Sequence, residues 1–129
     1  PFARRAQVTR QALGRAGERK AWRFLKRRGL RLITRNWRCD LGELDLIARD
    51  GDIVVFIEVR TTASKAPFAG APEHTVGPDK QRRVKRLGRA WLAKSAWQPQ
   101  GVRFDVVALN RRSWFRWDVR YYPSAFEGS

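Results

Sequence analysis

The strongest constraint on the fold of this chain is a pair of apolar segments separated by a turn dipeptide. Glu43–Arg49 and Asp52–Arg60 are both rich in branched apolar residues, and Asp50-Gly51 lies between them. Aspartate followed by glycine favours the tight turns that join antiparallel strands, because glycine adopts a positive φ without strain. The sequence therefore predicts a β-hairpin in the middle of the chain.

A two-residue turn also fixes which residues oppose each other across the hairpin. In this register Asp45 opposes Phe56, Glu43 opposes Glu58, and Asp45 and Glu58 are diagonal neighbours on one face. Diagonal neighbours lie about 7–8 Å apart at the backbone, close enough for two carboxylates to meet one cation. That face would also carry Ile47, Val54 and Arg60, and the opposite face Leu44, Leu46, Val55 and Ile57.

Apolar residues at three- and four-residue spacing predict a helix over Thr9–Arg28 and a second helix over Pro78–Ser95. Glycine follows the first helix and proline opens the second, as is common at these positions. Residues 1–8 are expected to fray, and residues 61–77 are expected to form a long loop.

Alternating apolar residues predict three strands besides the hairpin, at 30–36, 102–109 and 114–121. The resulting order is one helix, three strands, a second helix and two strands. This order predicts an α/β fold with a mixed central sheet flanked by helices and an extra C-terminal edge strand. The length of 129 residues fits a single domain, 1–129.

The charge of the chain points to a polyanionic partner. Lys and Arg number 28 against 12 Asp and Glu, a formal net charge of +16. Such an excess opposes folding by self-repulsion unless a polyanion normally lies against it, and nucleic acid is the expected partner. A ribosomal or membrane-surface role would explain the charge equally well. The longest apolar run, Ile53–Ile57, is too short to span a membrane, and we expect a cytoplasmic protein.

The acids on the hairpin suggest a metal site. Glu43, Asp45 and Glu58 share one face in a chain with few acids, and like charges across a strand pair destabilise it. A bound cation would offset this repulsion, and Mg²⁺ or Mn²⁺ suits a small open carboxylate cluster. Cys39 and His74 are single residues of their kinds, so a cysteine-based zinc site is excluded and any metal would be held by oxygen. Alternatively, the acids are solvated or paired with arginines.

Several ordered segments together resemble the YraN-like family of small bacterial proteins. They are Gly17-Glu18, Asn36–Cys39, Gly42–Gly51, Phe56–Thr61, Gly77–Arg83 and Arg103–Ala108. The resemblance covers roughly residues 14 to 109. It implies a branch of the PD-(D/E)xK nuclease superfamily, similar to archaeal Holliday-junction resolvases. It also implies the restriction-endonuclease-like αβββαβ core, and the dimers of resolvases imply a possible homodimer.

Carried onto this sequence, the resemblance makes Glu18 the acid of the first helix and Asp45 and Glu58 the metal ligands. The lysine position of the superfamily is occupied by Arg60, a departure that puts catalysis in doubt, because arginine stays protonated and cannot act as a base. Lys80 is a possible substitute, since helical spacing directs it inward from the first turn of the second helix. We expect it to approach Glu58; alternatively, its stem covers apolar surface.

Outward basic residues of the helices and the first strand form the expected contacts to phosphates. With neighbouring polar and aromatic side chains, the predicted nucleic-acid-binding residues are Arg19, Arg23, Arg35, Trp37, Arg38, Gln81, Arg82, Lys85, Arg86 and Arg89. Of the six tryptophans, Trp37 is the chosen candidate for stacking on bases, because arginines lie on both sides of it. His74, in the proline- and glycine-rich loop, is interpreted as a solvated side chain.

The leading functional hypothesis is magnesium-dependent hydrolysis of phosphodiester bonds in branched or single-stranded DNA. Two alternatives stay open at this stage. One is a non-catalytic nucleic-acid-binding module with a degenerate nuclease site, which Arg60 favours. The other is an RNA- or ribosome-associated factor, which the charge alone would explain.

Overall fold

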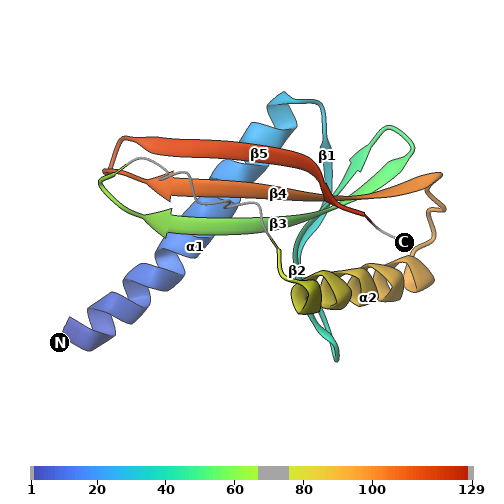
Figure 1. Ribbon diagram of the computed structural model, residues 1–129, viewed down its shortest axis with the longest axis horizontal. Helices are drawn as coiled ribbons and strands as arrows, with labels where there is room; N and C mark the ends of the chain where they lie inside the picture. The colour runs from blue at the N-terminus through green and yellow to red at the C-terminus, as the bar shows by residue number, and fades with distance from the viewer. Residues whose placement is uncertain (1, 67–75, 128–129) are drawn as a thin grey trace.

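A single five-stranded sheet with a helix on each face organises the molecule (Figure 1). The computed structural model describes residues 2–66 and 76–127, with side chains from residue 10 onward. In chain order the elements are α1 (Phe2–Arg27), β1 (Arg31–Cys39), β2 (Gly42–Asp50), β3 (Ile53–Ala63), α2 (Pro78–Lys94), β4 (Gly101–Arg111) and β5 (Trp117–Phe126).

The strands lie side by side in chain order, β1-β2-β3-β4-β5. β3 and β4 are parallel, and the three other pairs are antiparallel. A parallel pair needs a connection that crosses back over the sheet, and α2 lies within that connection. The predicted α/β class, the mixed sheet and the C-terminal edge strand are confirmed.

Each face of the sheet has its own apolar core. Ala21 and Leu25 of α1 pack on Val55 and Ile57, on one face, and on their neighbours in β2 and β4. The opposite face packs against Val84 and Leu87 of α2. The sheet residues of this second core are Leu44, Ile47, Val54, Phe56 and Phe104. Because consecutive β3 residues alternate between the two cores, the segment Val54–Ile57 is buried from both sides.

Glycines allow both helices to approach the sheet closely. A β-carbon at Gly17 of α1 would overlap the side chain of Thr61 on β3. A β-carbon at Gly88 of α2 would lie 2.9 Å from the ring of Phe56. Atoms at such separations repel, so alanine at either position would force the helix away from the sheet. Gly17 directly precedes Glu18, so the close approach of Gly17 to Thr61 also sets how near Glu18 lies to the sheet.

The hairpin is present, but its predicted register is wrong by two residues. Asp50 pairs with Ile53, and the loop residues are therefore Gly51 and Asp52 rather than Asp50-Gly51. Gly51 has φ +61°, the conformation that glycine adopts without strain. A shift by two residues preserves the faces of regular strands, but it replaces the predicted Asp45–Phe56 pairing.

The predicted face of Leu44 is also wrong. Leu44 packs in the same core as Ile47, three residues later, whereas Leu46 packs on the opposite face. A regular strand cannot direct residues three apart to one face, so β2 departs from regular alternation around Asp45. On the neighbouring strand Asn36 has φ +53°, which asparagine tolerates better than most residues.

Other predicted boundaries need correction. α1 begins at Phe2, so the expected frayed segment 1–8 continues the helix from residue 2 onward. β3 extends to Ala63, into the predicted loop, and residue 74 of that loop lies outside the described residues. β5 begins at Trp117 rather than at Trp114, because the alternating pattern there belongs partly to a turn.

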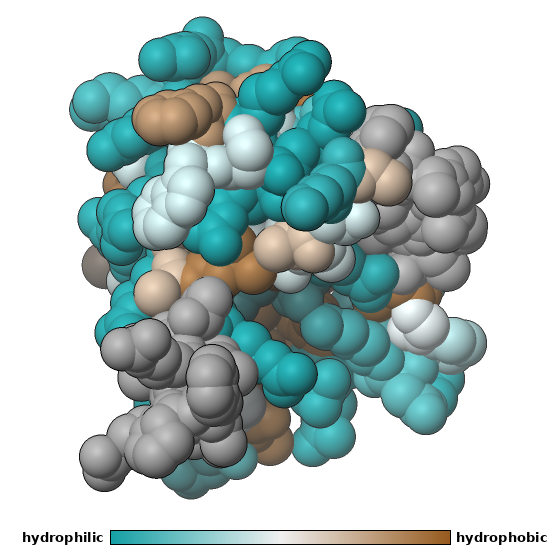
Figure 2. All heavy atoms as spheres, turned by 90° about the vertical axis from the view of Figure 1, so that its left-hand side faces the viewer, coloured by the Kyte–Doolittle hydropathy of each residue, from teal (hydrophilic) through white to brown (hydrophobic). Residues whose placement is uncertain are grey.

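The end of the molecule where β4 turns into β5 is predominantly hydrophilic (Figure 2). Figure 2 looks onto this end, and hydrophilic side chains cover most of it with apolar ones scattered between them. Among the described residues, no helix is both long and apolar enough to cross a membrane.

Candidate functional site

Asp45 and Glu58 lie together where β2 and β3 separate. The backbone pairing of the two strands ends with Leu46 opposite Ile57, so Asp45 and Glu58 each lie one residue beyond the last pair, and their side chains are hydrogen-bonded to each other. Here the β3 backbone bonds to a side chain of β2 instead of to the β2 backbone: Val59 N–H donates a 2.9 Å hydrogen bond to Asp45 Oδ2. The predicted approach of these two acids to each other is therefore present.

The environment of this pair disfavours two negative charges. Burial raises the pKa of Asp45 to about 7, and the negative charge of Glu58 acts in the same direction. The hydrogen bond from Val59 N–H lowers the pKa, and Glu18 raises it further. The Asp45 carboxyl therefore keeps its proton to a higher pH than an ordinary aspartate does.

Lys80 approaches the two acids from α2. Its Nζ lies 2.5 Å from Glu58 Oε1, and the Glu58 side chain is 16% exposed. Pro78 begins α2, so Lys80 stands in the first turn of that helix. The expected approach of Lys80 to Glu58 is therefore observed, whereas its part in a reaction stays a prediction.

Two adjoining cavities surround these residues. A cavity of about 210 Å³ is lined by Leu41, Gly42, Glu43, Asp45, Glu58, Lys80, Arg83, Val84 and Leu87. A second cavity, of about 570 Å³, is lined by Gln11, Gly14, Arg15, Glu18, Asn36, Arg38 and Glu43. Glu43 borders both, so the two cavities meet at β2 and bring residues of α1 and α2 to one region. We call the smaller cavity the acid cleft.

Glu18 lines the larger cavity, as an acid of the first helix. Burial raises its pKa, and the negative charge of Glu43 adds to that rise. A hydrogen bond with the Asn36 side chain and the positive charge of Arg35 act in the opposite direction. Sequence reasoning assigned no role to Asn36, although it opens the Asn36–Cys39 segment that carried part of the family resemblance.

Two arginines follow Glu58 and Lys80 on their own elements. Arg60 lies two residues beyond Glu58 on β3 and is half-buried, but the residues that line the acid cleft do not include it among those described. Arg83 does line the cleft, and sequence reasoning missed it. The available signal was its helical spacing, three residues after Lys80.

The predicted nucleic-acid contacts do not form one surface. Exposed arginines lie on α1, on the edge strand β1 and on α2, and the two helices cover opposite faces of the sheet. These residues are Arg19, Arg23, Arg35, Arg38, Arg82, Arg86 and Arg89. Lys85 lies half-buried over the Phe126 ring at 5.9 Å, and Gln81 Nε2 donates to Val76 O at 2.6 Å. Trp37 is partly buried against the α2-side core, so the proposed stacking residue is at the core edge.

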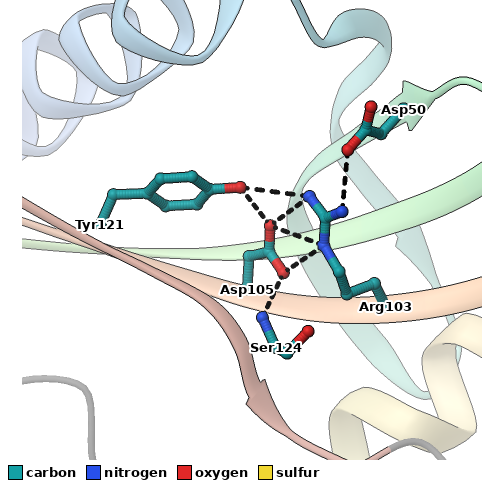
Figure 3. Close-up of polar contacts among 5 residues, drawn as sticks. All are labelled: Asp50, Arg103, Asp105, Tyr121 and Ser124. Atoms are coloured by element: carbon teal, nitrogen blue, oxygen red, sulfur yellow. Dashed lines mark hydrogen bonds and ion pairs between the residues drawn. The ribbon is translucent and has the colours of Figure 1, made fainter. Parts of the chain in front are cut away.

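A second carboxylate, Asp105 on β4, is fully buried and fully satisfied (Figure 3). Arg103 Nε donates to its Oδ1 at 3.0 Å and Arg103 Nη2 to its Oδ2 at 2.9 Å. The Tyr121 hydroxyl donates to Oδ2 at 2.5 Å, and Ser124 N–H donates to Oδ1 at 2.9 Å. Arg103 Nη1 also reaches Asp50 Oδ2 at 2.8 Å, so this network links the hairpin turn to β4 and β5.

The acid cleft suits one class of metal. In the ranges 2–66 and 76–127, no group of three or more acidic, histidine or cysteine side chains is arranged to hold a metal ion. The chain would therefore offer two carboxylates, Asp45 and Glu58. Magnesium is held in this way, by one or two carboxylates with the remaining positions left to water and phosphate. The donor set thus fits Mg²⁺ or Mn²⁺.

Comparison with known proteins places the chain in a family. Residues 17–109 match the family described as "Uncharacterised protein family UPF0102". The chain belongs to this family. Its relatives include a UPF0102 protein of Anaeromyxobacter dehalogenans, 45% identical over 92% of this chain and 87% of the relative. Another, from Geotalea uraniireducens, is 40% identical over 91% of both chains. The matched range of this UPF0102 chain contains Glu18, Asp45, Glu58 and Lys80.

Proposed function

We propose that this UPF0102 protein is a magnesium-dependent nuclease that hydrolyses phosphodiester bonds in branched or single-stranded DNA. The observation that carries the proposal is the acid cleft, where two opposed carboxylates and a lysine ammonium from another element converge. The net charge of +16 supports a nucleic-acid partner. The same geometry supports the finer assignment to the PD-(D/E)xK nuclease superfamily, which the sequence resemblance implies.

Asp45 and Glu58 would hold the metal. A bound Mg²⁺ would polarise the scissile phosphate and activate a water, as divalent cations do in phosphodiester hydrolysis. Val59 N–H holds the Asp45 carboxylate in place, and the parallel pairing of β3 with β4 holds the backbone of Glu58 opposite Val106. Both ligands therefore belong to rigid strands, which favours a fixed coordination geometry.

Lys80 and Arg83 would serve the phosphate. The Lys80 ammonium lies against Glu58 and can orient a water by hydrogen bonding, or donate to a phosphate oxygen once the metal neutralises Glu58. Arg83 lines the same cleft and adds a permanent positive charge for the charge that develops on the phosphate. In this proposal Lys80 takes the place that Arg60 cannot fill as a base.

The decisive experiment is a cleavage assay with a matched variant. Labelled four-way junction, single-stranded DNA and RNA are incubated with Mg²⁺ or Mn²⁺, using the wild type, Glu58→Gln and the exposed control Asp52→Asn. We expect cleavage of a DNA substrate that falls at least about a hundredfold in Glu58→Gln, because the metal loses a ligand. Asp52→Asn should cut normally, since Asp52 is exposed and lies in the hairpin turn.

Arg60 favours a second candidate, a nucleic-acid-binding module without catalysis, because the lysine position of the superfamily holds a residue that cannot transfer protons. The same assay separates the two functions. Binding of DNA with no metal-dependent cutting by the wild type would refute the nuclease and support the module. Cutting of RNA alone would replace DNA as the substrate.

A further inference from the structure

The turn between β4 and β5 presents two aromatic rings to solvent. Trp114 is 83% and Phe115 is 96% exposed, whereas Leu41, the next most exposed large apolar side chain among the described residues, is 43% exposed. Turns usually use glycine, proline, asparagine, aspartate or serine. Exposed aromatic rings forgo the stabilisation that their burial would give, so the fold itself provides no reason for them at this position.

The turn that carries the rings is closed by its own backbone. Arg112 N–H and Ser113 N–H both donate to Arg116 O, at 2.8 and 3.3 Å. Phe115 N–H donates to Ser113 Oγ at 3.3 Å. These bonds hold the turn in one conformation, and the rings are presented rather than left on a loose chain. A preformed surface loses less entropy when a ligand binds.

A basic cavity adjoins each ring. Trp114 borders a cavity of about 260 Å³, which is also lined by Ala63, Ser64, Lys65, Arg111, Arg112 and Ser113. The Arg111 guanidinium lies 5.3 Å from the centre of the Trp114 ring. Phe115 borders a second cavity, of about 310 Å³, together with Lys20, Arg23 and Arg27 of α1. Cations beside an exposed ring are the combination that binds phosphate and base of one nucleotide together.

We propose that Trp114 and Phe115 form a stacking platform for unpaired bases, with phosphates held by the arginines and lysines of the two basic cavities. This inference rests on the nucleic-acid half of the proposed function and names the residues that would select its substrate class. Rings can stack only on bases whose faces are free, so the platform selects single-stranded or branched nucleic acid over continuous duplex.

The platform is within reach of the acid cleft along one strand. Ala63, which lines the cavity beside Trp114, lies five residues beyond Glu58 on β3. At about 3.3 Å per residue this separation is about 16 Å. One nucleic-acid strand could therefore contact the platform and the cleft together. The turn lies beyond residues 17–109, so the family match does not account for its aromatic residues.

Two other occupants fit the surface less well. A second copy of the chain would need roughly 800 Å² of surface on each partner, and two aromatic side chains supply about 300–500 Å². A membrane with anionic lipids would complement the positive charge. However, each ring has its own basic cavity, and two separate cavities fit successive phosphates of one nucleic-acid strand better than a continuous lipid surface. Both occupants are outcomes of the test below.

The test measures binding without cleavage, in metal-free buffer at constant ionic strength, since salt strongly affects such binding. Fluorescence anisotropy follows a labelled oligothymidine of about 20 nucleotides, which is long enough for such sites, and a duplex of the same length. The variants are Trp114→Ala/Phe115→Ala, the ring-retaining Trp114→Tyr/Phe115→Tyr, and Ile33→Ala/Val102→Ala, which removes two exposed apolar side chains elsewhere.

We expect the double alanine variant to bind the single strand at least about tenfold more weakly, and the duplex almost unchanged, because base stacking is lost. The tyrosine variant should retain most of the binding, and the Ile33/Val102 control all of it. Equal weakening for both nucleic acids, or no weakening for the single strand, would overturn the platform. Vesicles rich in phosphatidylserine and sedimentation of the free protein are the remaining arms. A loss confined to vesicle binding or to self-association would assign the rings to a membrane or a second copy.

This outcome is independent of catalysis. A protein that binds single strands through the rings but cuts nothing refutes hydrolysis and leaves the platform in place. A protein that cuts DNA through Glu58 with no dependence of binding on the rings refutes the platform alone.

Discussion

Asp105 and Asp45 lie on strands of the same sheet, yet the protein surrounds them differently. Asp105 receives hydrogen bonds from Arg103, Tyr121 and the backbone of Ser124, so its buried charge is satisfied. Asp45 faces another acid, Glu58, and its pKa is raised to about 7. Removing one partner from a satisfied buried ion pair destabilises the fold, whereas two like charges held close together lower its stability. This difference separates the structural acid from the candidate functional one.

The largest expected effect is the loss of Asp105. We expect Asp105→Ala to lower the free energy of unfolding by about 3–5 kcal/mol, because it removes the buried acid of the network and leaves Arg103 with only the partly exposed Asp50 as an ion-pair partner. Urea denaturation measures the change. The control is Asp52→Ala, whose carboxylate lies 3.9 Å from Arg49 and is 68% exposed, and which should change stability by less than about 1 kcal/mol. Equal losses of stability in the two variants would show that Asp105 is not a structural acid.

Lys80 should affect cleavage rather than folding. Lys80→Ala is expected to slow metal-dependent cutting by about a hundredfold, the lower end of what a positioned proton donor or acceptor contributes. Lys80→Arg then asks which property of the lysine matters. Recovery with arginine would indicate a charge contact, and no recovery would indicate proton transfer. Single-turnover rates provide the measurement, and an unchanged rate in Lys80→Ala would remove Lys80 from the site.

Asp45 should make stability depend on pH in a defined direction. The folded chain holds a proton on Asp45 up to a pKa of about 7, whereas the unfolded chain releases it near the ordinary value of 3.8. Between these values the folded state binds more protons, so the free energy of unfolding should fall as the pH rises through this window.

Asp45→Asn is the matched variant for this prediction. It removes the charge with little change in shape, and we expect a smaller pH dependence and a gain of about 1 kcal/mol at pH near 8, within the range of single substitutions. Urea titrations at pH near 5 and near 8 provide the values. Mg²⁺ should stabilise the wild type at the higher pH and have little effect on the variant. A wild type and a variant with the same pH slope would contradict this account.

The smallest expected effect concerns Glu18. It lines the larger cavity rather than the acid cleft, so Glu18→Gln should reduce cleavage by less than about tenfold, through charge and orientation. Its clearest effect should be a lower pKa of Asp45, because the charge of Glu18 contributes to that rise. NMR titration of Asp45 checks this shift, and an unchanged titration would show that the two cavities act independently.

Periodicity was enough to predict the elements and the sharing of one region by Asp45 and Glu58. From Leu46 to Ile57 alternation gave the correct faces although the register was wrong, because the register error was two residues, the period of a strand. Helical spacing likewise directed Lys80 toward Glu58. These predictions required only local geometry.

What the sequence did not predict depends on departures from regular geometry. The turn uses Gly51 and Asp52, and dipeptide preference alone does not decide which two residues form the loop. Asp45 binds the backbone of β3 because β2 changes course there, and no local pattern marks such a separation. Trp114 and Phe115 continue an alternating pattern that reads as a strand, whereas the chain turns at these residues.

The placement of the two helices on opposite faces of the sheet limits which nucleic acids can meet both. Duplex DNA is stiff over about 150 base pairs, and bending a short site by 40–90° costs about 1–6 kcal/mol. A straight duplex that follows the arginines of α1 therefore runs away from those of α2, and it would have to curve round the edge strand β1 to reach them. If the proposed function holds, the arms of a branched molecule, which already diverge, would need less bending to follow both helices.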